Sequence, residues 1–251
     1  MKNVVIVLPT YNEAENCELF LRETTETIEN LGEEYKNSYS FKFLVVDDYS
    51  PDGTGDIVRR LQNEMPNLYL IQKYKEGLGK AYIAGFKYAI TELSADYVIE
   101  MDSDFSHNPK DIRRLVDEIK NGFTFIIGSR YTAGGRIPDN WGYFRVMNSK
   151  YGNIFARHIA GISFVKDCTS GFRLLDCGLL KKIDLDNLRA SGYSFQMNIL
   201  YEMIKQGAQV KEIPISFVDR TLGKSKLSKR DVVEFIINSF QILFERLTKP
   251  N

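Results

Sequence analysis

The first half of this chain alternates strand-like and helix-like segments, and this alternation constrains the fold more than any other feature. Apolar runs typical of strands cover residues 4–8, 42–47, 68–72, 96–101 and 123–128. Segments with helical spacing lie between them, at 13–30, 54–64, 78–91 and 109–120. Strands that are almost continuously Val, Ile and Leu are typical of a parallel sheet with both faces covered. The pattern therefore predicts an α/β fold with a mainly parallel central sheet and helices on both faces.

The length of the chain favours a single large domain. It has 251 residues, of which 43% are hydrophobic, and this is enough for one sizeable core. No internal repeat, low-complexity tract or linker divides it, and the less regular second half is interpreted as an elaboration packed on the same core. We expect one domain over residues 1–228, followed by an amphipathic C-terminal helix over 229–251.

Charge and cysteine content exclude several classes of protein. Lys and Arg together number 33, as do Asp and Glu, so no overall basic charge predicts a nucleic-acid partner. The three cysteines match no metal-binding spacing, which favours a reducing compartment. The apolar run near the N-terminus is too short for a signal peptide, and no stretch approaches the roughly 18 apolar residues of a membrane span. We therefore expect a soluble or peripheral protein.

Two carboxylates separated by one residue follow the strand-like run near residue 100. If that strand continues, Asp102 and Asp104 share a face, because side chains on a strand alternate. Paired carboxylate oxygens suit Mg²⁺ or Mn²⁺ that carries the phosphates of a substrate. An isolated pair of this kind is also typical of a solvated acidic loop, so the surrounding motifs decide between the two interpretations.

The polar clusters of the first half fall at the ends of predicted strands. They lie at 9–13, 47–53, 102–107 and 129–130, after the first, second, fourth and fifth strands. In parallel sheets, ligands bind at the carboxyl ends of the strands, which meet at one edge. This shared position favours the metal and nucleotide interpretation of Asp102 and Asp104.

The first two clusters contain residue types suited to a nucleotide. Tyr11 is able to stack on a base and Glu13 to accept a hydrogen bond from a sugar hydroxyl, although a packed aromatic and a helix cap explain the same segment. Asp47 and Asp48 end a buried strand, where carboxylates are costly unless they bind something. The glycines around Lys80 would let a backbone approach phosphate, but they lack the spacing of a P-loop.

Several segments together carry a resemblance to a known family. They are LPTYNEAEN, VVDDYSPDGT, GLGKAYIAG, MDSDFSHNP, GSRY, TSGFRL, GYSFQ and ISFVDRTLGKSKL. The chain resembles family 2 glycosyltransferases, and within them it is most similar to dolichol-phosphate mannose synthases of the short form, without transmembrane helices, and to related polyprenyl-phosphate sugar transferases. The likeness is collinear from about residue 3 to 228. Its last segment is the most specific to the lipid-phosphate branch.

The resemblance implies a GT-A fold, a nucleotide-sugar donor and a divalent metal, Mg²⁺ or Mn²⁺. The implied nucleotide-sugar site consists of Pro9, Tyr11, Glu13, Asp47, Asp48, Lys80 and Asp102. The implied metal ligands are Asp102 and Asp104, with Ser106 at a position where several family members carry a glutamine ligand. Because serine is shorter and neutral, a water molecule would substitute there.

Basic residues at matching positions are implied to gather the phosphates of donor and acceptor. The implied acceptor-phosphate set is Arg130, Arg145, Ser149, Arg220 and Lys226, and the implied catalytic set is Asp104, Arg130, Arg220 and Lys226. Guanidinium groups grip phosphate through paired hydrogen bonds, and they reduce the repulsion between two anionic substrates. The glycine-containing segment between Arg220 and Lys226 is interpreted as a lid over the donor.

The reaction that the resemblance implies is inverting transfer of mannose from GDP-mannose to dolichyl or another polyprenyl phosphate. Because the acceptor phosphate is already an oxyanion at neutral pH, this reaction needs no general base. One alternative keeps the lipid acceptor and changes the donor to UDP-glucose or another nucleotide sugar. A second alternative is a non-catalytic homologue that binds lipid or a partner.

Two amphipathic segments offer a path for the lipid tail of the acceptor. Residues 143–165 mix aromatic and aliphatic residues with cations, and residues 231–248 are strongly apolar at helical spacing. Such helices lie at a membrane interface or pack on a core, and the sequence leaves both open. The resemblance implies a peripheral protein at the cytoplasmic face of a membrane, bound directly or through small membrane-protein partners.

Overall fold

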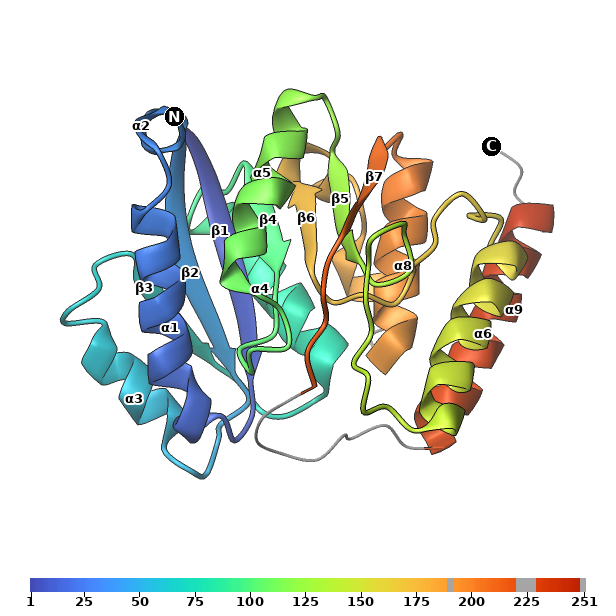
Figure 1. Cartoon of the computed structure of the whole chain (residues 1–251), viewed down its shortest axis with the longest axis horizontal. Coiled ribbons are helices and arrows are strands. Elements are labelled where there is room, and N and C mark those ends of the chain that lie inside the picture. Colours follow the sequence, from blue (N-terminus) through green and yellow to red (C-terminus); the bar gives the residue numbers. More distant parts are fainter. Residues whose placement is uncertain (189–191, 220–228, 249–251) are drawn as a thin grey trace.

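The computed structural model describes residues 1–188, 192–219 and 229–248, and a seven-stranded sheet runs through this part of the chain (Figure 1). Its strands are β1 (Lys2–Thr10), β2 (Tyr39–Asp47), β3 (Leu68–Gln72), β4 (Tyr97–Glu100), β5 (Phe125–Ser129), β6 (Arg173–Asp176) and β7 (Val210–Pro214). Their order across the sheet is β3-β2-β1-β4-β6-β5-β7. Only β6 is antiparallel to its neighbours, which confirms the mainly parallel sheet.

Helices cover both faces of the sheet, as the alternation predicted (Figure 1). One face carries α1 (Ala14–Glu29), α3 (Thr54–Leu61), the 3-10 turn η1 (Pro109–Asp111) and α5 (Ile112–Lys120). The other face carries α4 (Leu78–Thr91) and α8 (Gly192–Lys205), with α6 (Tyr143–Ile159) and α9 (Lys229–Thr248) packed together beyond α8. The short elements are α2 (Glu33–Ser38), α7 (Cys177–Leu180) and η2 (Leu185–Asn187).

Alternation along the central strands divides the core into two apolar layers. On one face, Ile6 of β1 belongs to the layer that contains Phe20 of α1 and Val58 of α3. On the other face, Val7 belongs to the layer that contains Phe86 of α4. All five side chains are fully buried, so the strands must be apolar on both sides. This is why they appear in the sequence as continuous apolar runs.

The predicted strands and helices of the first half are confirmed to within a few residues, with one consequential difference. β4 ends at Glu100, so Asp102 and Asp104 lie beyond the strand in a series of bends. The alternation of strand side chains therefore does not place these two carboxylates. The second half contributes β6, which enters the sheet between β4 and β5, and β7 at the edge.

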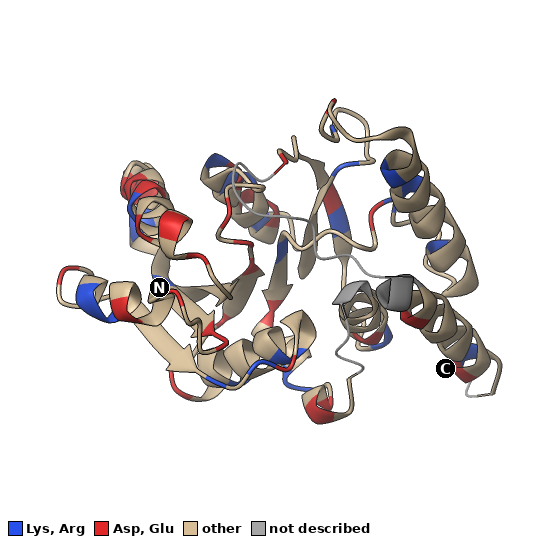
Figure 2. Ribbon diagram, turned by 90° about the horizontal axis from the view of Figure 1, so that it is seen from below, with Lys and Arg blue, Asp and Glu red and all other residues tan. Residues whose placement is uncertain are grey.

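The carboxyl ends of β1, β2, β4 and β5 meet at one edge of the sheet, together with the amino end of the antiparallel β6. Figure 2 looks onto this edge, where acidic and basic positions lie on the loops that follow the strands. The polar clusters of the sequence are therefore brought to a common edge.

Candidate active site

The carboxylate at the end of β2 is already fully hydrogen-bonded inside the protein. Asp47 is completely buried and accepts from Thr10 Oγ1 (3.2 Å), Ser50 N (3.1 Å), Ser50 Oγ and Gln72 Nε2 (2.9 Å). Four donors use the acceptor capacity of a carboxylate. Asp47 therefore fixes the loop after β2, and its predicted contact with a nucleotide stays a prediction.

The next residue is better placed to meet a ligand. Asp48 is 6% exposed, and its Oδ1 lies 3.4 Å from Lys73 Nζ, just after β3. Burial raises the pKa of Asp48, and the Lys73 ammonium opposes that rise. Beside this pair, Tyr49 and Tyr74 form an exposed aromatic contact with ring centroids 5.1 Å apart. A carboxylate, an ammonium and aromatic rings thus lie together at the ends of β2 and β3.

The loop between β1 and α1 brings the other predicted nucleotide residues to the same edge. Pro9 lies in β1 past the end of its pairing with β4, where its missing N–H costs no ladder bond. The Tyr11 ring lies 3.2 Å from Lys75 Nζ, a cation–π contact. Glu13 is the residue before α1, and its backbone N–H donates to Thr54 Oγ1 (3.1 Å). Lys80 is half-buried in the first turn of α4.

The two candidate metal carboxylates lie on a tightly turned loop. The Asp102 side chain is 28% exposed, whereas Asp104 is 3% exposed and accepts at Oδ1 from Ser106 N (3.0 Å). Phe105, between Asp104 and Ser106, has a φ of 63°, a strained conformation for a residue with a side chain. Strain of this kind concentrates at functional sites, and Phe105 is held by an edge-to-face contact with Phe20.

The chemistry of this loop fits a divalent cation bound together with a phosphate. Ser106 Oγ is buried and has no hydrogen-bond partner among the described residues. Two carboxylates and this hydroxyl are hard oxygen ligands, and Mg²⁺ or Mn²⁺ commonly completes such a set with phosphate oxygens and water. No group of three or more His, Cys, Asp or Glu in the described ranges makes an all-protein metal cage. The donor set therefore suits a metal that arrives with a substrate.

Arg130, immediately after β5, is held by a buried carboxylate. Its Nε and Nη2 donate to Asp167 Oδ2 (2.8 Å) and Oδ1 (2.7 Å), and Nη2 also donates to Thr169 Oγ1 (2.9 Å). Asp167 is completely buried, and Arg130 is 8% exposed. Burial alone would raise the pKa of Asp167, but Arg130 and its hydrogen bonds outweigh this effect and lower it. The guanidinium is thus fixed in one orientation.

The remaining predicted phosphate ligands are only partly brought together. Ser149 on α6 hydrogen-bonds Tyr131 (2.6 Å between hydroxyl oxygens), and Arg130 lies over the Tyr131 ring. Arg145 on α6 is paired with Asp219 (3.0 and 3.1 Å) and lies 4.0 Å from the centre of the Trp141 ring. The predicted Arg220 and Lys226 lie outside the described residues.

Sequence reasoning missed the residues that support this site. Asp167 and Thr169 orient Arg130, and Gln72 holds Asp47. Buried charge leaves no periodic signal in the sequence, so only the TSGFRL motif, which begins at Thr169, pointed to this region. His107 is 2% exposed and packs between Phe172 and Phe217.

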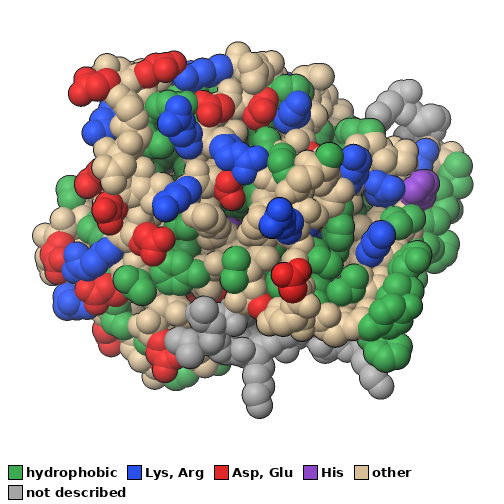
Figure 3. Space-filling view, viewed as in Figure 1, with side chains coloured by type: hydrophobic (Ala, Val, Ile, Leu, Met, Phe, Trp, Pro, Cys, Tyr) green, Lys and Arg blue, Asp and Glu red, His purple; other side chains and the backbone are tan. Residues whose placement is uncertain are grey.

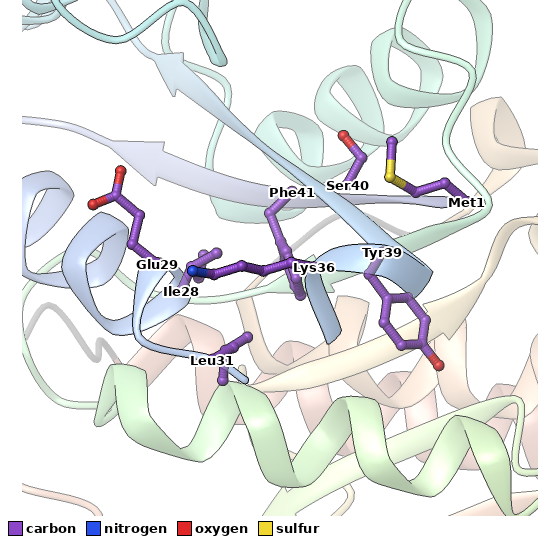
Figure 4. A pocket seen from close by; sticks show the side chains of 8 residues that line it. All are labelled: Met1, Ile28, Glu29, Leu31, Lys36, Tyr39, Ser40 and Phe41. Carbon is purple, nitrogen blue, oxygen red and sulfur yellow. The ribbon is translucent and has the colours of Figure 1, made fainter. Parts of the chain in front are cut away.

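A small pocket lies away from the candidate site (Figure 4). It is lined by Met1, Ile28, Glu29, Leu31, Lys36, Tyr39, Ser40 and Phe41, at the amino ends of β1 and β2 and the end of α1. None of the predicted site residues lines it. The lining is mainly apolar, and it lies at the opposite ends of these strands from the carboxylates.

Solved structures share the fold described above. The structure aligns over its full length with glucosyl-3-phosphoglycerate synthase from Mycobacterium tuberculosis, crystallised with Mn²⁺, UDP-glucose and phosphoglyceric acid. The TM-score is 0.65, the alignment covers 81% of that chain, and the identity is 16%. An identity this low shows the fold alone, which is the GT-A glycosyltransferase fold.

Sequence comparison identifies closer relatives. The chain is 36% identical over 236 residues to undecaprenyl-phosphate mannosyltransferase of Micrococcus luteus, covering 94% of this chain and 91% of the relative. It is 36% identical over 235 residues to polyprenol monophosphomannose synthase of Mycolicibacterium smegmatis, covering 93% and 84%. Residues 5–184 match the model of glycosyl transferase family 2. The chain therefore belongs to glycosyl transferase family 2.

Proposed function

We propose that this protein transfers mannose from GDP-mannose to dolichyl or another polyprenyl phosphate, with inversion at the sugar and with Mg²⁺ or Mn²⁺. The observation that carries this proposal is the arrangement at the carboxyl edge, where Asp102 and Asp104 lie at the end of β4 and the fixed Arg130 lies at the end of β5. The mannosyltransferase names of the relatives supply the sugar and the lipid class.

The proposed division of labour follows from the chemistry of these groups. The acceptor phosphate is itself the nucleophile, so the chain needs to position it rather than deprotonate it. Arg130 presents a pre-oriented guanidinium to phosphate oxygens. Asp102, Asp104 and Ser106 would hold the metal, which supplies electrostatic stabilisation of the leaving diphosphate. Catalysis then rests on positioning and on charge complementarity.

The test of this proposal is transfer of radiolabelled sugar to polyprenyl phosphate. GDP-mannose and UDP-glucose are assayed in parallel, each with Mn²⁺ and with EDTA. EDTA-sensitive label in the lipid from GDP-mannose alone is the expected result. Label from UDP-glucose alone would show that UDP-glucose, not GDP-mannose, is the donor. No label from either nucleotide sugar would favour a non-catalytic homologue.

The pair formed by Asp48 and Lys73 favours guanine as the donor base. The Watson–Crick edge of guanine has one carbonyl acceptor followed by two N–H donors. A carboxylate complements the two donors, because both of its oxygens accept. The Lys73 ammonium, which contacts Asp48, Tyr74 O and Glu76, would donate to the carbonyl by exchanging its contact with the exposed Glu76 carboxylate. Uracil offers a single N–H between two carbonyls, so one carbonyl would face a carboxylate oxygen. A site of this kind discriminates by leaving the wrong ligand unpaired.

Replacing Asp48 by asparagine is therefore expected to weaken recognition of the guanine base. An amide keeps one acceptor and presents a donor in place of the other, so the preference for GDP over UDP should fall about tenfold or more. The measurement is competitive inhibition of transfer by GDP and by UDP. Asp56→Asn, at an exposed carboxylate on α3, is the matched control. An unchanged inhibition ratio would remove Asp48 from base recognition.

We further propose that α6 and α9 form the face that meets the membrane, at its cytoplasmic side. The exposed apolar residues of α6 are Tyr143, Phe144, Tyr151 and Phe155, and those of α9 are Val233, Ile236, Ile237, Phe240, Phe244 and Leu247. Figure 3 shows green side chains gathered over this part of the molecule. No helix in the described ranges is long and apolar enough to cross a bilayer. Contiguous apolar surface of this extent supports an interfacial role.

The opposite side of α9 belongs to the core, which changes how its role is tested. Phe235 and Ile242 are buried, so deleting the helix would expose the core as well as remove the membrane face. Phe244→Glu and Leu247→Glu instead alter only side chains that are 68% and 73% exposed. Together they are expected to lower sedimentation with anionic liposomes about tenfold or more, because each apolar contact with lipid contributes roughly 1 kcal/mol or more.

The matched control is Leu19→Glu, at a leucine that is 62% exposed on α1, on the other face of the sheet. This control should sediment like the unaltered protein. Equal sedimentation of all variants would show that the apolar face of α9 does not bind lipid.

A further inference from the structure

A fully buried arginine joins three segments behind the candidate active site. Arg173 is the first residue of β6 and is 0% exposed. Its Nη2 donates to the backbone oxygen of Cys168 (2.7 Å), and its Nη1 donates to the backbone oxygen of Gln196 on α8. One guanidinium thus ties the start of β6 to the preceding loop and to α8.

The counter-charge for this arginine comes from the strand that leads to the metal carboxylates. Glu100, the last residue of β4, is the direct cross-strand partner of Arg173 and is also 0% exposed. Burial raises the pKa of Glu100 to about 7, against the attraction of Arg173 and a hydrogen bond with the side chain of Gln196, and Arg173 Nε has no hydrogen-bond partner within the described residues. A buried charge pair with incomplete hydrogen bonding is weak evidence for stability, because desolvation offsets most of the attraction. Its presence at this place therefore calls for another explanation.

Two of the segments that meet at Arg173, the end of β4 and the loop before β6, carry part of the proposed site. Glu100 is followed two residues later by Asp102, and Cys168 lies between the two residues that orient Arg130, Asp167 and Thr169. The segments also meet in space. A Cβ atom on Gly171 would lie 3.8 Å from Asp102 Oδ2 and 3.9 Å from Gln196 Nε2.

We propose that Arg173 is a positioning residue, which fixes the loop that orients Arg130 relative to the carboxylates at the end of β4, with Glu100 as its counter-charge. This inference rests on the proposed transfer reaction. It explains why a desolvated pair lies at the edge where the anionic substrates must be aligned. It also explains the residue type, since only arginine supplies a planar fork that reaches two carbonyl oxygens at once.

The test combines Arg173→Lys with the double variant Glu100→Gln/Arg173→Met. Lysine keeps the positive charge but lacks the planar pair of N–H donors that reaches both backbone oxygens. The double variant removes both charges, a replacement that is often neutral for stability. For each protein, the thermal unfolding midpoint, kcat, the donor KM and the dissociation constant for GDP with Mn²⁺ are measured, with kinetics well below the midpoint. Lys42→Met is the matched control, since this cation also donates to a backbone oxygen (Leu93, 3.2 Å) but lies in the amino-terminal half of β2.

For both test variants, kcat is expected to fall about 10- to 100-fold, the cost of misplacing a catalytic group by a fraction of an ångström to an ångström. The dissociation constant for GDP with Mn²⁺ should stay within about threefold, because the base site at β2 and β3 is not touched. Lys42→Met should keep the kcat of the unaltered protein.

A purely structural role would give a different pattern. The double variant would then recover kcat together with its unfolding midpoint, and this result would overturn the proposal. The same conclusion would follow if Arg173→Lys kept the kcat of the unaltered protein. An unaltered protein that transfers no sugar would instead contradict the proposed function, and the two failures are therefore distinguishable.

Discussion

Replacing Asp104 by asparagine is expected to lower kcat/KM for sugar transfer about 1,000-fold without unfolding the protein. In the proposed site this carboxylate holds the metal that stabilises the leaving diphosphate. Losing one such electrostatic contribution typically lowers kcat 100- to 1,000-fold. Asparagine has the same shape and keeps an oxygen that accepts from Ser106 N, so the strained loop around Phe105 retains its internal hydrogen bond. The measurements are transfer kinetics and thermal unfolding.

The specificity of this result depends on its control and on a direct measurement of the metal. Asp56→Asn removes an exposed carboxylate on α3, 82% exposed at its side chain, and should leave the rate unchanged. Calorimetric titration with Mn²⁺ in the presence of GDP should show weaker binding for Asp104→Asn alone. Near-normal, EDTA-sensitive turnover by Asp104→Asn would exclude Asp104 from the metal site.

The position of these carboxylates was predictable because it depends on local patterns. Continuous apolar runs marked β1, β2 and β4, and the polar residues after each run then had to meet at one edge of a parallel sheet. The conformation of the loop was not predictable in this way. β4 ends at Glu100, and Asp104 lies in a turn with a positive φ at Phe105, where its carboxylate accepts from Ser106 N.

The residues that hold the site residues in place were missed because they act through contacts between positions that are distant in the sequence. Asp167 meets Arg130 across 37 positions, and Arg173 meets Glu100 only because β6 enters the sheet beside β4. β6 has only four residues, and so short an apolar run does not predict which strands lie beside it in the sheet. Likewise, Asp47 and Asp48 look equivalent in the sequence, and only the surrounding donors show that Asp47 is internally saturated.

Replacing Asp167 by asparagine is expected to have the largest effect on stability. The change removes the carboxylate that holds the guanidinium of Arg130, whose side chain is 7% exposed. Removing one partner of a buried ion pair costs about 3–5 kcal/mol. For a chain of this size, that corresponds to a fall in the thermal unfolding midpoint of roughly 6–20 °C. An unchanged midpoint would show that Arg130 finds another partner or reaches solvent.

The same pair makes stability depend on pH in the acidic range. Because Arg130 holds the pKa of Asp167 below its ordinary value of 3.8, the pair contributes stability above that pH, and the contribution is lost as pH falls through the lowered pKa. The unaltered protein should therefore lose part of its stability below about pH 4. Asp167→Asn should show a flatter profile there, measured by unfolding at a series of pH values.

A double variant separates the stability of this pair from its proposed use in catalysis. Arg130→Met/Asp167→Asn leaves no unpaired charge in the interior, so its unfolding midpoint should recover relative to Asp167→Asn. Sugar transfer should not recover, because methionine offers no donor to phosphate. Recovery of both properties would mean that Arg130 only balances a buried carboxylate. Recovery of stability alone would support the proposal that Asp167 orients the Arg130 guanidinium for binding the substrate phosphates.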